Sequence, residues 1–213
     1  AEEGFPEVLG RGRALAAAYV SPSTQDACVG PAVLSAYEKG DGDGILTLNV
    51  NTAIKIDPLK DDTAQVEKIK ILANRFREGR LKVSSAKIFA AGVIEAKTAN
   101  LLLPYCHTKG GNGKLNFAPD RLGSLVSKLE SAGIQVHIHS IGDGATRASL
   151  DAFEKSRRQN PESHNRRSHI AHLELVDRAD LPRFASLSVT ATIQPYWAQQ
   201  DEYIVRLTEP VLG

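Results

Sequence analysis

Apolar residues recur along the chain with two different periods, and these periods predict alternating helices and strands. Helical spacing covers residues 62–78, 119–132, 145–158 and 178–187, and Asp177 is a candidate N-cap for the last helix. Apolar runs of strand length cover residues 45–56, 83–89, 134–139, 169–173 and 189–194, and a further short strand is expected before Asp26. Two Gly-rich segments, 41–44 and 109–114, predict loops. Strands that alternate with helices predict βαβ units, a parallel sheet and one domain over residues 1–213.

Composition and charge exclude several classes of protein. Of the 213 residues, 42% are hydrophobic and 24% are charged, which are ordinary globular values. The formal net charge is only +1, which gives no electrostatic reason to expect a nucleic acid or a membrane surface as the partner. There is no apolar run of about 18 residues, and residues 1–10 do not have the pattern of a signal peptide.

The cysteine and methionine contents suggest a compartment and a fragment. Cys28 and Cys106 lie far apart without a CxxC pair, which favours a reducing compartment, and we expect the cytoplasm. The chain contains no methionine, although translation begins with one. We therefore interpret the sequence as a fragment of a longer protein.

Lysine and histidine side chains, which can bind metal or transfer protons, lie in the predicted strands toward their C-terminal ends. The active sites of βα barrels lie at these strand ends. Lys87 lies in one strand, and each of the next two strands carries a pair of histidines, His137 with His139 and His169 with His172. A single histidine there is most often structural. Two histidine-bearing strands in succession make the structural interpretation less favoured. His137 and His139 are two residues apart, so both rings point to the same face of the strand, which suits two metal ligands or one ligand and a residue that supports it.

Lys87 and several residues that follow the predicted strands each have two interpretations, one structural and one functional. Lys87 is either a solvated lysine or a buried amine whose pKa is lowered, and a neutral amine can add carbon dioxide to form a metal-bridging carbamate. Asp143 either caps the following helix or orients His139 or a ligand. Tyr196 and Trp197 are either packing residues or a wall of the substrate pocket. We assign substrate binding to Asp143, Gln194, Tyr196 and Trp197.

Three segments resemble amidohydrolase family 3, a group of metal-dependent hydrolases that includes relatives of N-substituted formamide deformylases. They are KIFAAGVIEAKTANLLLPY, GIQVHIHSIGDGATRASLDAFE and HIAHLELVDRADLPRFASLSVTATIQPYWAQQDEY, and QDACVGPAVLSAY near the start is similar too. The resemblance runs from about Ala14 to Tyr203. It implies a (β/α)8 TIM barrel, of which about strands two to seven are present.

The resemblance also implies a metal site with one or two divalent ions, expected to be zinc. By its place in the motifs, Lys87 matches a lysine that is typically carboxylated, and His139 and His172 match metal-binding histidines. His137 and His169 do not match ligand positions, so we assign them to structure. Ala91 and Ala171 stand where the family often has Asp and Glu.

The function that the resemblance implies is hydrolysis of a non-peptide carbon–nitrogen bond, such as an amide, in a small-molecule substrate by a metal-activated water. No segment resembles the family's first-strand HxH or its eighth-strand Asp, the general base, so we expect no catalytic residue in this chain and no activity for the chain alone. Two alternatives remain open, which are a non-catalytic barrel that binds or regulates, and phosphate-directed hydrolysis. Exposed sheet edges also leave homo-oligomerisation open.

Overall fold

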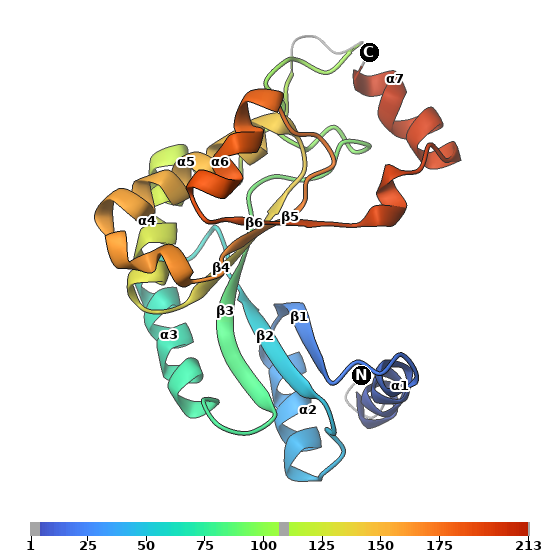
Figure 1. Cartoon of the computed structure of the whole chain (residues 1–213), viewed down its shortest axis with the longest axis vertical. Helices are drawn as coiled ribbons and strands as arrows, with labels where there is room; N and C mark the ends of the chain where they lie inside the picture. The colour runs from blue at the N-terminus through green and yellow to red at the C-terminus, as the bar shows by residue number, and fades with distance from the viewer. Residues whose placement is uncertain (1–4, 107–110, 213) are drawn as a thin grey trace. The chain divides into compact units, whose positions relative to one another are not determined.

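Strands and helices alternate along the chain in the computed structural model, which describes residues 5–106 and 111–212 (Figure 1). The strands are β1 Ser23–Val29, β2 Asn49–Lys55, β3 Leu81–Phe89, β4 Gln135–Ser140, β5 His169–His172 and β6 Thr190–Ile193. The helices between and around them are α1 Phe5–Ala18, α2 Pro31–Gly42, α3 Asp62–Arg75, α4 Pro119–Ser131, α5 Asp143–Gln159, α6 Leu181–Ser186 and α7 Glu209–Leu212. The predicted α/β fold is confirmed, and six strands with intervening helices match an incomplete TIM barrel.

The chain divides into two compact units, which are described separately. The first comprises Ala1–Ile56 and Asp61–Lys87, and the second comprises Asp57–Lys60 and Ile88–Gly213. In both units the strand order follows the chain order. Every pairing within a unit is parallel. Among the described residues, no helix has both the length and the apolar character that crossing a membrane requires.

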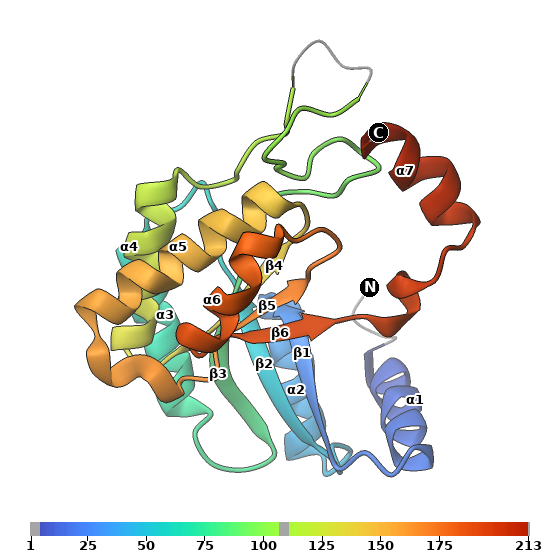
Figure 2. The same ribbon diagram turned by 45° about the horizontal axis from the view of Figure 1, so that its top comes forward.

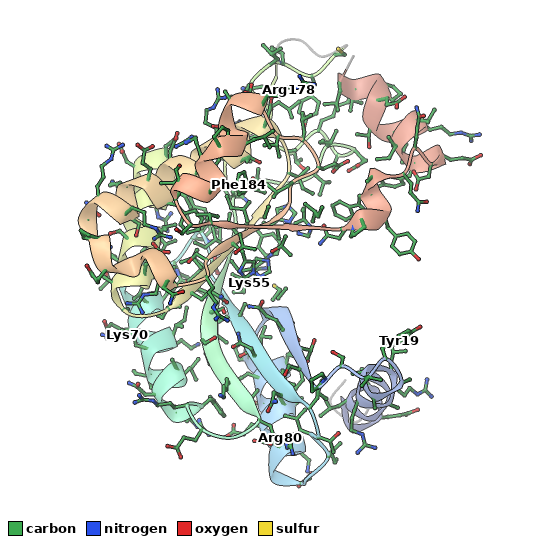
Figure 3. The ribbon with its side chains drawn as sticks, in the orientation of Figure 1. Tyr19, Lys55, Lys70, Arg80, Arg178 and Phe184 are labelled. Atoms are coloured by element: carbon green, nitrogen blue, oxygen red, sulfur yellow. The ribbon has the colours of Figure 1, made fainter. Side chains whose placement is uncertain are left out.

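In the first unit, strands β1, β2 and β3 are accompanied by α2 and α3. Asp61 is the N-cap of α3, and its side chain accepts a hydrogen bond from Ala64 N at 2.8 Å. Such a cap contributes about 1 kcal/mol. Arg80, labelled in Figure 3, lies directly before β3. It donates to the carbonyl oxygen of Thr47 at 2.9 Å and so ties the start of β3 to the segment before β2. Beyond the end of α1, Tyr19 is 79% exposed.

In the second unit, helices α4 and α5 lie side by side and both pack against β4, while α6 packs against β6 (Figure 2). Val136 and Ile138 alternate with His137 and His139 along β4, so the two pairs face opposite sides of the sheet. All four side chains are buried. Burial on both faces is typical of parallel sheets.

A buried ion pair ties α4 to α5. Glu130 is fully buried and pairs with Arg157, whose side chain is 5% exposed. The Glu130 carboxylate also accepts hydrogen bonds from Ser156 at 2.6 Å and Ser168 at 2.7 Å. Because Ser168 directly precedes β5, this network joins both helices to the strand that carries His172.

Several element boundaries differ from those the periodicity predicts. The helix expected over 178–187 is a 3-10 turn, Arg178–Asp180, followed by the short α6, and Asp177 caps the turn by accepting from Ala179 N at 2.8 Å. The helices α1 and α2 were not predicted. The strand expected before Asp26 is β1, which runs through that residue. Of the two predicted loops, 41–44 overlaps the end of α2, and 109–114 lies partly outside the described residues.

Candidate metal centre

His139 lies near the C-terminal end of β4, and a backbone carbonyl holds its ring. The side chain is buried, and Nε2 lies 3.1 Å from the carbonyl oxygen of Gly92, in the segment that follows β3. A carbonyl oxygen only accepts hydrogen bonds, so Nε2 carries the proton and Nδ1 carries the lone pair. The ring of Phe89 packs 5.1 Å away, centroid to centroid.

His172 is the last residue of β5, and its ring has the opposite tautomer. Its Nδ1 lies 3.2 Å from Oε1 of Gln194, which accepts the hydrogen bond, so Nε2 carries the lone pair. The backbone leaves the strand in an unusual conformation, since φ is +81° at His172 and +56° at Leu173. The indole of Trp197 stacks on the imidazole at 5.3 Å with an interplanar angle of 16°.

The two imidazoles lie together at the ends of adjacent parallel strands. Their centroids are 4.5 Å apart and their planes are inclined by 63°. Zinc binds a histidine nitrogen at about 2.0–2.1 Å, and a catalytic zinc site has three protein ligands. The His139 and His172 donors therefore fit two ligands of such a site. In the described parts of the chain, no group of three or more His, Cys, Asp or Glu side chains is arranged so that it could hold a metal ion.

The other two histidines of these strands contact each other. His137 and His169 are paired in the β4–β5 register, and their ring centroids are 4.1 Å apart. Both lie toward the N-terminal side of His139 and His172 on their strands. Their assignment to structure stays a prediction.

Asp143 anchors the long connection between β3 and α4. Its Oδ1 accepts hydrogen bonds from Leu102 N and from Gly144 N, both at 2.9 Å. Asp143 is the first residue of α5, and Gly142 occupies the N-cap position. A Cβ at Gly142 would lie 2.4 Å from the carbonyl oxygen of Asn100. The Gly-Asp-Gly sequence is thus a docking site for residues 100–102, and a contact of Asp143 with substrate stays a prediction.

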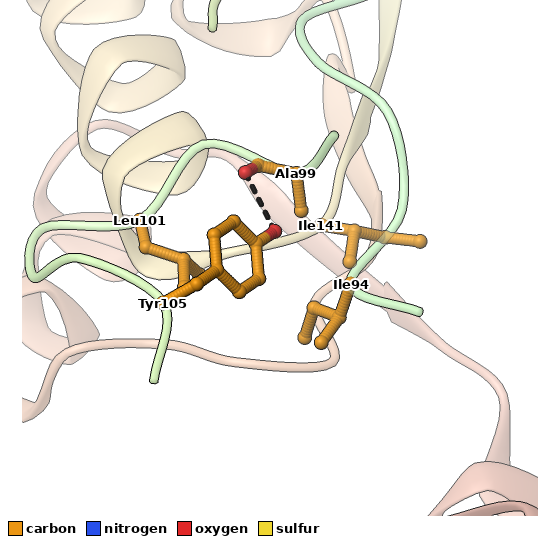
Figure 4. Packing of buried hydrophobic residues seen from close by; sticks show 5 residues of the cluster. All are labelled: Ile94, Ala99, Leu101, Tyr105 and Ile141. Carbon is orange, nitrogen blue, oxygen red and sulfur yellow. Dashed lines mark hydrogen bonds between the residues drawn. The ribbon is translucent and has the colours of Figure 1, made fainter. Parts of the chain in front are cut away.

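The docked connection has a small apolar core of its own (Figure 4). The cluster consists of Ile94, Ala99, Leu101, Tyr105 and Ile141, all buried. The Tyr105 hydroxyl donates to the carbonyl oxygen of Ala99 at 2.8 Å, and burial raises the pKa of that tyrosine to about 12. Because Gly92 lies in the same connection, this packing helps to hold the carbonyl that His139 contacts.

Lys87 lies in the first unit, near the C-terminal end of β3. Its side chain is 3% exposed, and this burial lowers the pKa of the amine to about 8. The interpretation of Lys87 as a solvated lysine is therefore wrong. Its participation in one site with His139 and His172 stays a prediction.

A pocket of about 480 Å³ is lined in part by Trp197, the residue whose indole stacks on His172. Burial, together with the neighbouring Glu95 carboxylate, raises the pKa of Glu174 to about 7. Glu95 and Glu174 both line this pocket. The remaining described residues of its wall are Val93, Ile141, Asp201, Tyr203 and Ile204. Tyr196 is 81% exposed, and its role in substrate binding stays a prediction.

The amidohydrolase family model matches residues 13–211, which is nearly the whole chain. This chain belongs to the amidohydrolase family. The predicted family is thereby confirmed, whereas the narrower similarity to N-substituted formamide deformylases stays a prediction.

Individual amidohydrolase relatives are considerably longer than this chain. YtcJ of Bacillus subtilis (strain 168) is 28% identical over 79% of this chain and 30% of its own length. The exoenzymes regulatory protein AepA of Pectobacterium carotovorum subsp. carotovorum is 28% identical over 67% of this chain and 30% of its own. The structure of an uncharacterized metal-dependent hydrolase from Pyrococcus furiosus covers all of this chain at 26% identity and a TM-score of 0.79. The chain spans 42% of that hydrolase.

Sequence reasoning about this amidohydrolase missed the residues that hold the candidate ligands. It gave no role to Gly92, Asn100 or Leu102, because their partners are distant in the sequence. Gly142 and Gly144 were a usable signal, since glycines often mark a position where another backbone segment comes close.

Proposed function

We propose that this chain carries part of the active site of a metal-dependent hydrolase that cleaves a non-peptide carbon–nitrogen bond, such as an amide, in a small molecule. The observation that supports this most is the pair of imidazoles at 4.5 Å, at the ends of adjacent parallel strands. Each ring donates one N–H to an oxygen acceptor, which is the arrangement expected of histidines that bind metal through the other nitrogen. The similarity to the Pyrococcus furiosus metal-dependent hydrolase also supports the proposal.

Two histidines of the chain would hold the metal. His139 through Nδ1 and His172 through Nε2 are the proposed ligands. A bound divalent metal, proposed to be zinc, lowers the pKa of a water molecule and polarises a carbonyl group. Lys87 stays a candidate ligand on the sequence resemblance, and its lowered pKa increases the fraction of neutral amine that can react with carbon dioxide.

The proposed reaction is hydrolysis. The oxygen of water bonds to the carbonyl carbon, the carbon–nitrogen bond breaks, and the proton released by the water goes to the departing amine. The second proton of the water remains on the acid product and passes to the amine at neutral pH, so the products are a carboxylate and a protonated amine. Trp197, which stacks on His172, would form the adjacent wall against which the substrate lies.

A second candidate function is a non-catalytic barrel with a binding or regulatory role. Ala91 and Ala171, both buried, stand where the sequence resemblance expects carboxylates that support a metal site. The similarity to AepA, which is named as a regulatory protein, also favours this alternative.

Metal analysis of the full-length protein distinguishes the two functions. For a hydrolase we expect stoichiometric divalent metal and turnover of at least one member of an amide panel. The double variant His139→Asn/His172→Asn should lose both. The matched control is His137→Asn, which changes a histidine on the same strand and face and should retain metal. A wild-type protein that binds no stoichiometric metal after incubation with zinc would favour the regulatory function.

A further inference from the structure

Gln194 lies where the chain turns out of β6, and its backbone conformation follows from the local sequence. Pro195 comes directly after it, and a residue before proline is restricted to extended conformations. Gln194 has φ −100° and ψ 107°, in agreement with this restriction. In the β5–β6 register His172 pairs with Ile193, so Gln194 is the next residue beyond the end of the paired strands. Its side chain thus begins beside the His172 ring.

The same turn brings a second side chain to His172. The 3-10 turn Pro195–Ala198 carries Trp197 onto the face of the imidazole at 5.3 Å, while Gln194 Oε1 contacts the ring edge at Nδ1. The His172 backbone has left the regular strand conformation, with φ +81°. Gln194 and Trp197 therefore both contribute to the orientation of the ring, together with the neighbouring His139 ring.

We propose that Gln194 is a positioning residue that fixes the tautomer of His172, and that it acts in this way in place of the substrate contact first assigned to it. The amide oxygen accepts only, so the facing Nδ1 must carry the proton and the lone pair must be on Nε2. This places the metal-binding electron pair on the edge of the ring away from Gln194. The consequence for metal binding rests on the proposed function, whereas the tautomer itself does not.

The test uses the full-length protein and the variants Gln194→Leu, Gln194→Glu and Gln199→Leu. Nitrogen-15 NMR of the His172 imidazole in metal-free protein reports the tautomer, and titration with zinc alone reports the affinity. We expect the Nδ1–H tautomer in the wild type and its loss in Gln194→Leu, with zinc affinity about 10–100-fold weaker. Gln194→Glu keeps an acceptor and should preserve both. Gln199 is exposed and directly follows the same turn, and Gln199→Leu should change neither.

The outcomes separate this proposal from the proposed function. A wild-type His172 with the proton on Nε2, or a Gln194→Leu variant with unchanged tautomer and zinc affinity, would overturn the positioning role. If Gln194→Leu does not fold, Gln194→Glu decides, because loss of the Nδ1–H tautomer in that folded variant also overturns it. A wild type that binds no zinc but changes tautomer in Gln194→Leu would overturn the metal site and support the role of Gln194.

Discussion

Replacing Gly142 with alanine should release the connection between β3 and α4 from the start of α5. Gly142 has φ +95°, a conformation that costs an alanine about 1–3 kcal/mol. The new Cβ would lie 2.4 Å from the carbonyl oxygen of Asn100, which accepts a hydrogen bond from Ala145 N at 3.0 Å. Moving Asn100 away breaks that bond and strains the bond from Leu102 N to Asp143, each worth about 0.5–1.5 kcal/mol. We therefore expect a destabilisation of about 2–5 kcal/mol.

Urea unfolding of the full-length protein measures this free energy, and amide hydrogen exchange locates it. Exchange should accelerate most at Leu102 and Ala145, the two amides that hold the connection. The matched control is Gly10→Ala in α1, where no atom lies within 4 Å of the new Cβ. That variant should be neutral or stabilised by up to about 1 kcal/mol. The reasoning is refuted if Gly142→Ala unfolds at the wild-type urea concentration with unchanged exchange at both amides.

Three further predictions concern buried ionisable groups. Arg157→Leu leaves the Glu130 carboxylate buried without its charge partner and should cost about 3–5 kcal/mol in urea unfolding, whereas the exposed control Arg158→Leu should cost less than about 1 kcal/mol. The pKa of Glu174 is raised from 4.5 to about 7, so between these pH values the folded state binds more protons than the unfolded state. The free energy of unfolding should therefore fall as pH rises from about 4.5 to 7. Thermal unfolding at several pH values should show a smaller fall in the Glu174→Gln variant. Carbon-13 NMR of the full-length protein with labelled bicarbonate should show a carbamate signal that Lys87→Met abolishes, and its presence in that variant would assign it to another amine.

The pattern of apolar residues was sufficient for the elements with a strong period. The prediction of a helix over 119–132 agrees with α4, because its apolar stripe, Leu122, Leu125, Val126 and Leu129, is fully buried. The same pattern missed α2, which begins with Pro31 but contains two glycines and buries only Leu34 and Gly40. A helix with so narrow a buried face has little periodic signal in its sequence.

Residue types at strand ends were enough to indicate the candidate ligands, and the tertiary structure decided how they are held. The sequence spacing predicted that His139 and His172 end neighbouring strands, because parallel βα units place successive strand ends at one edge. Their hydrogen-bond partners, the Gly92 carbonyl and Gln194, are 47 and 22 residues away, and Leu102 is 41 residues from Asp143. These pairings depend on how loops dock after the sheet has formed. Local periodicity carries no information on that docking, so the tautomers of the two histidines and the anchoring role of Asp143 followed only from the folded chain.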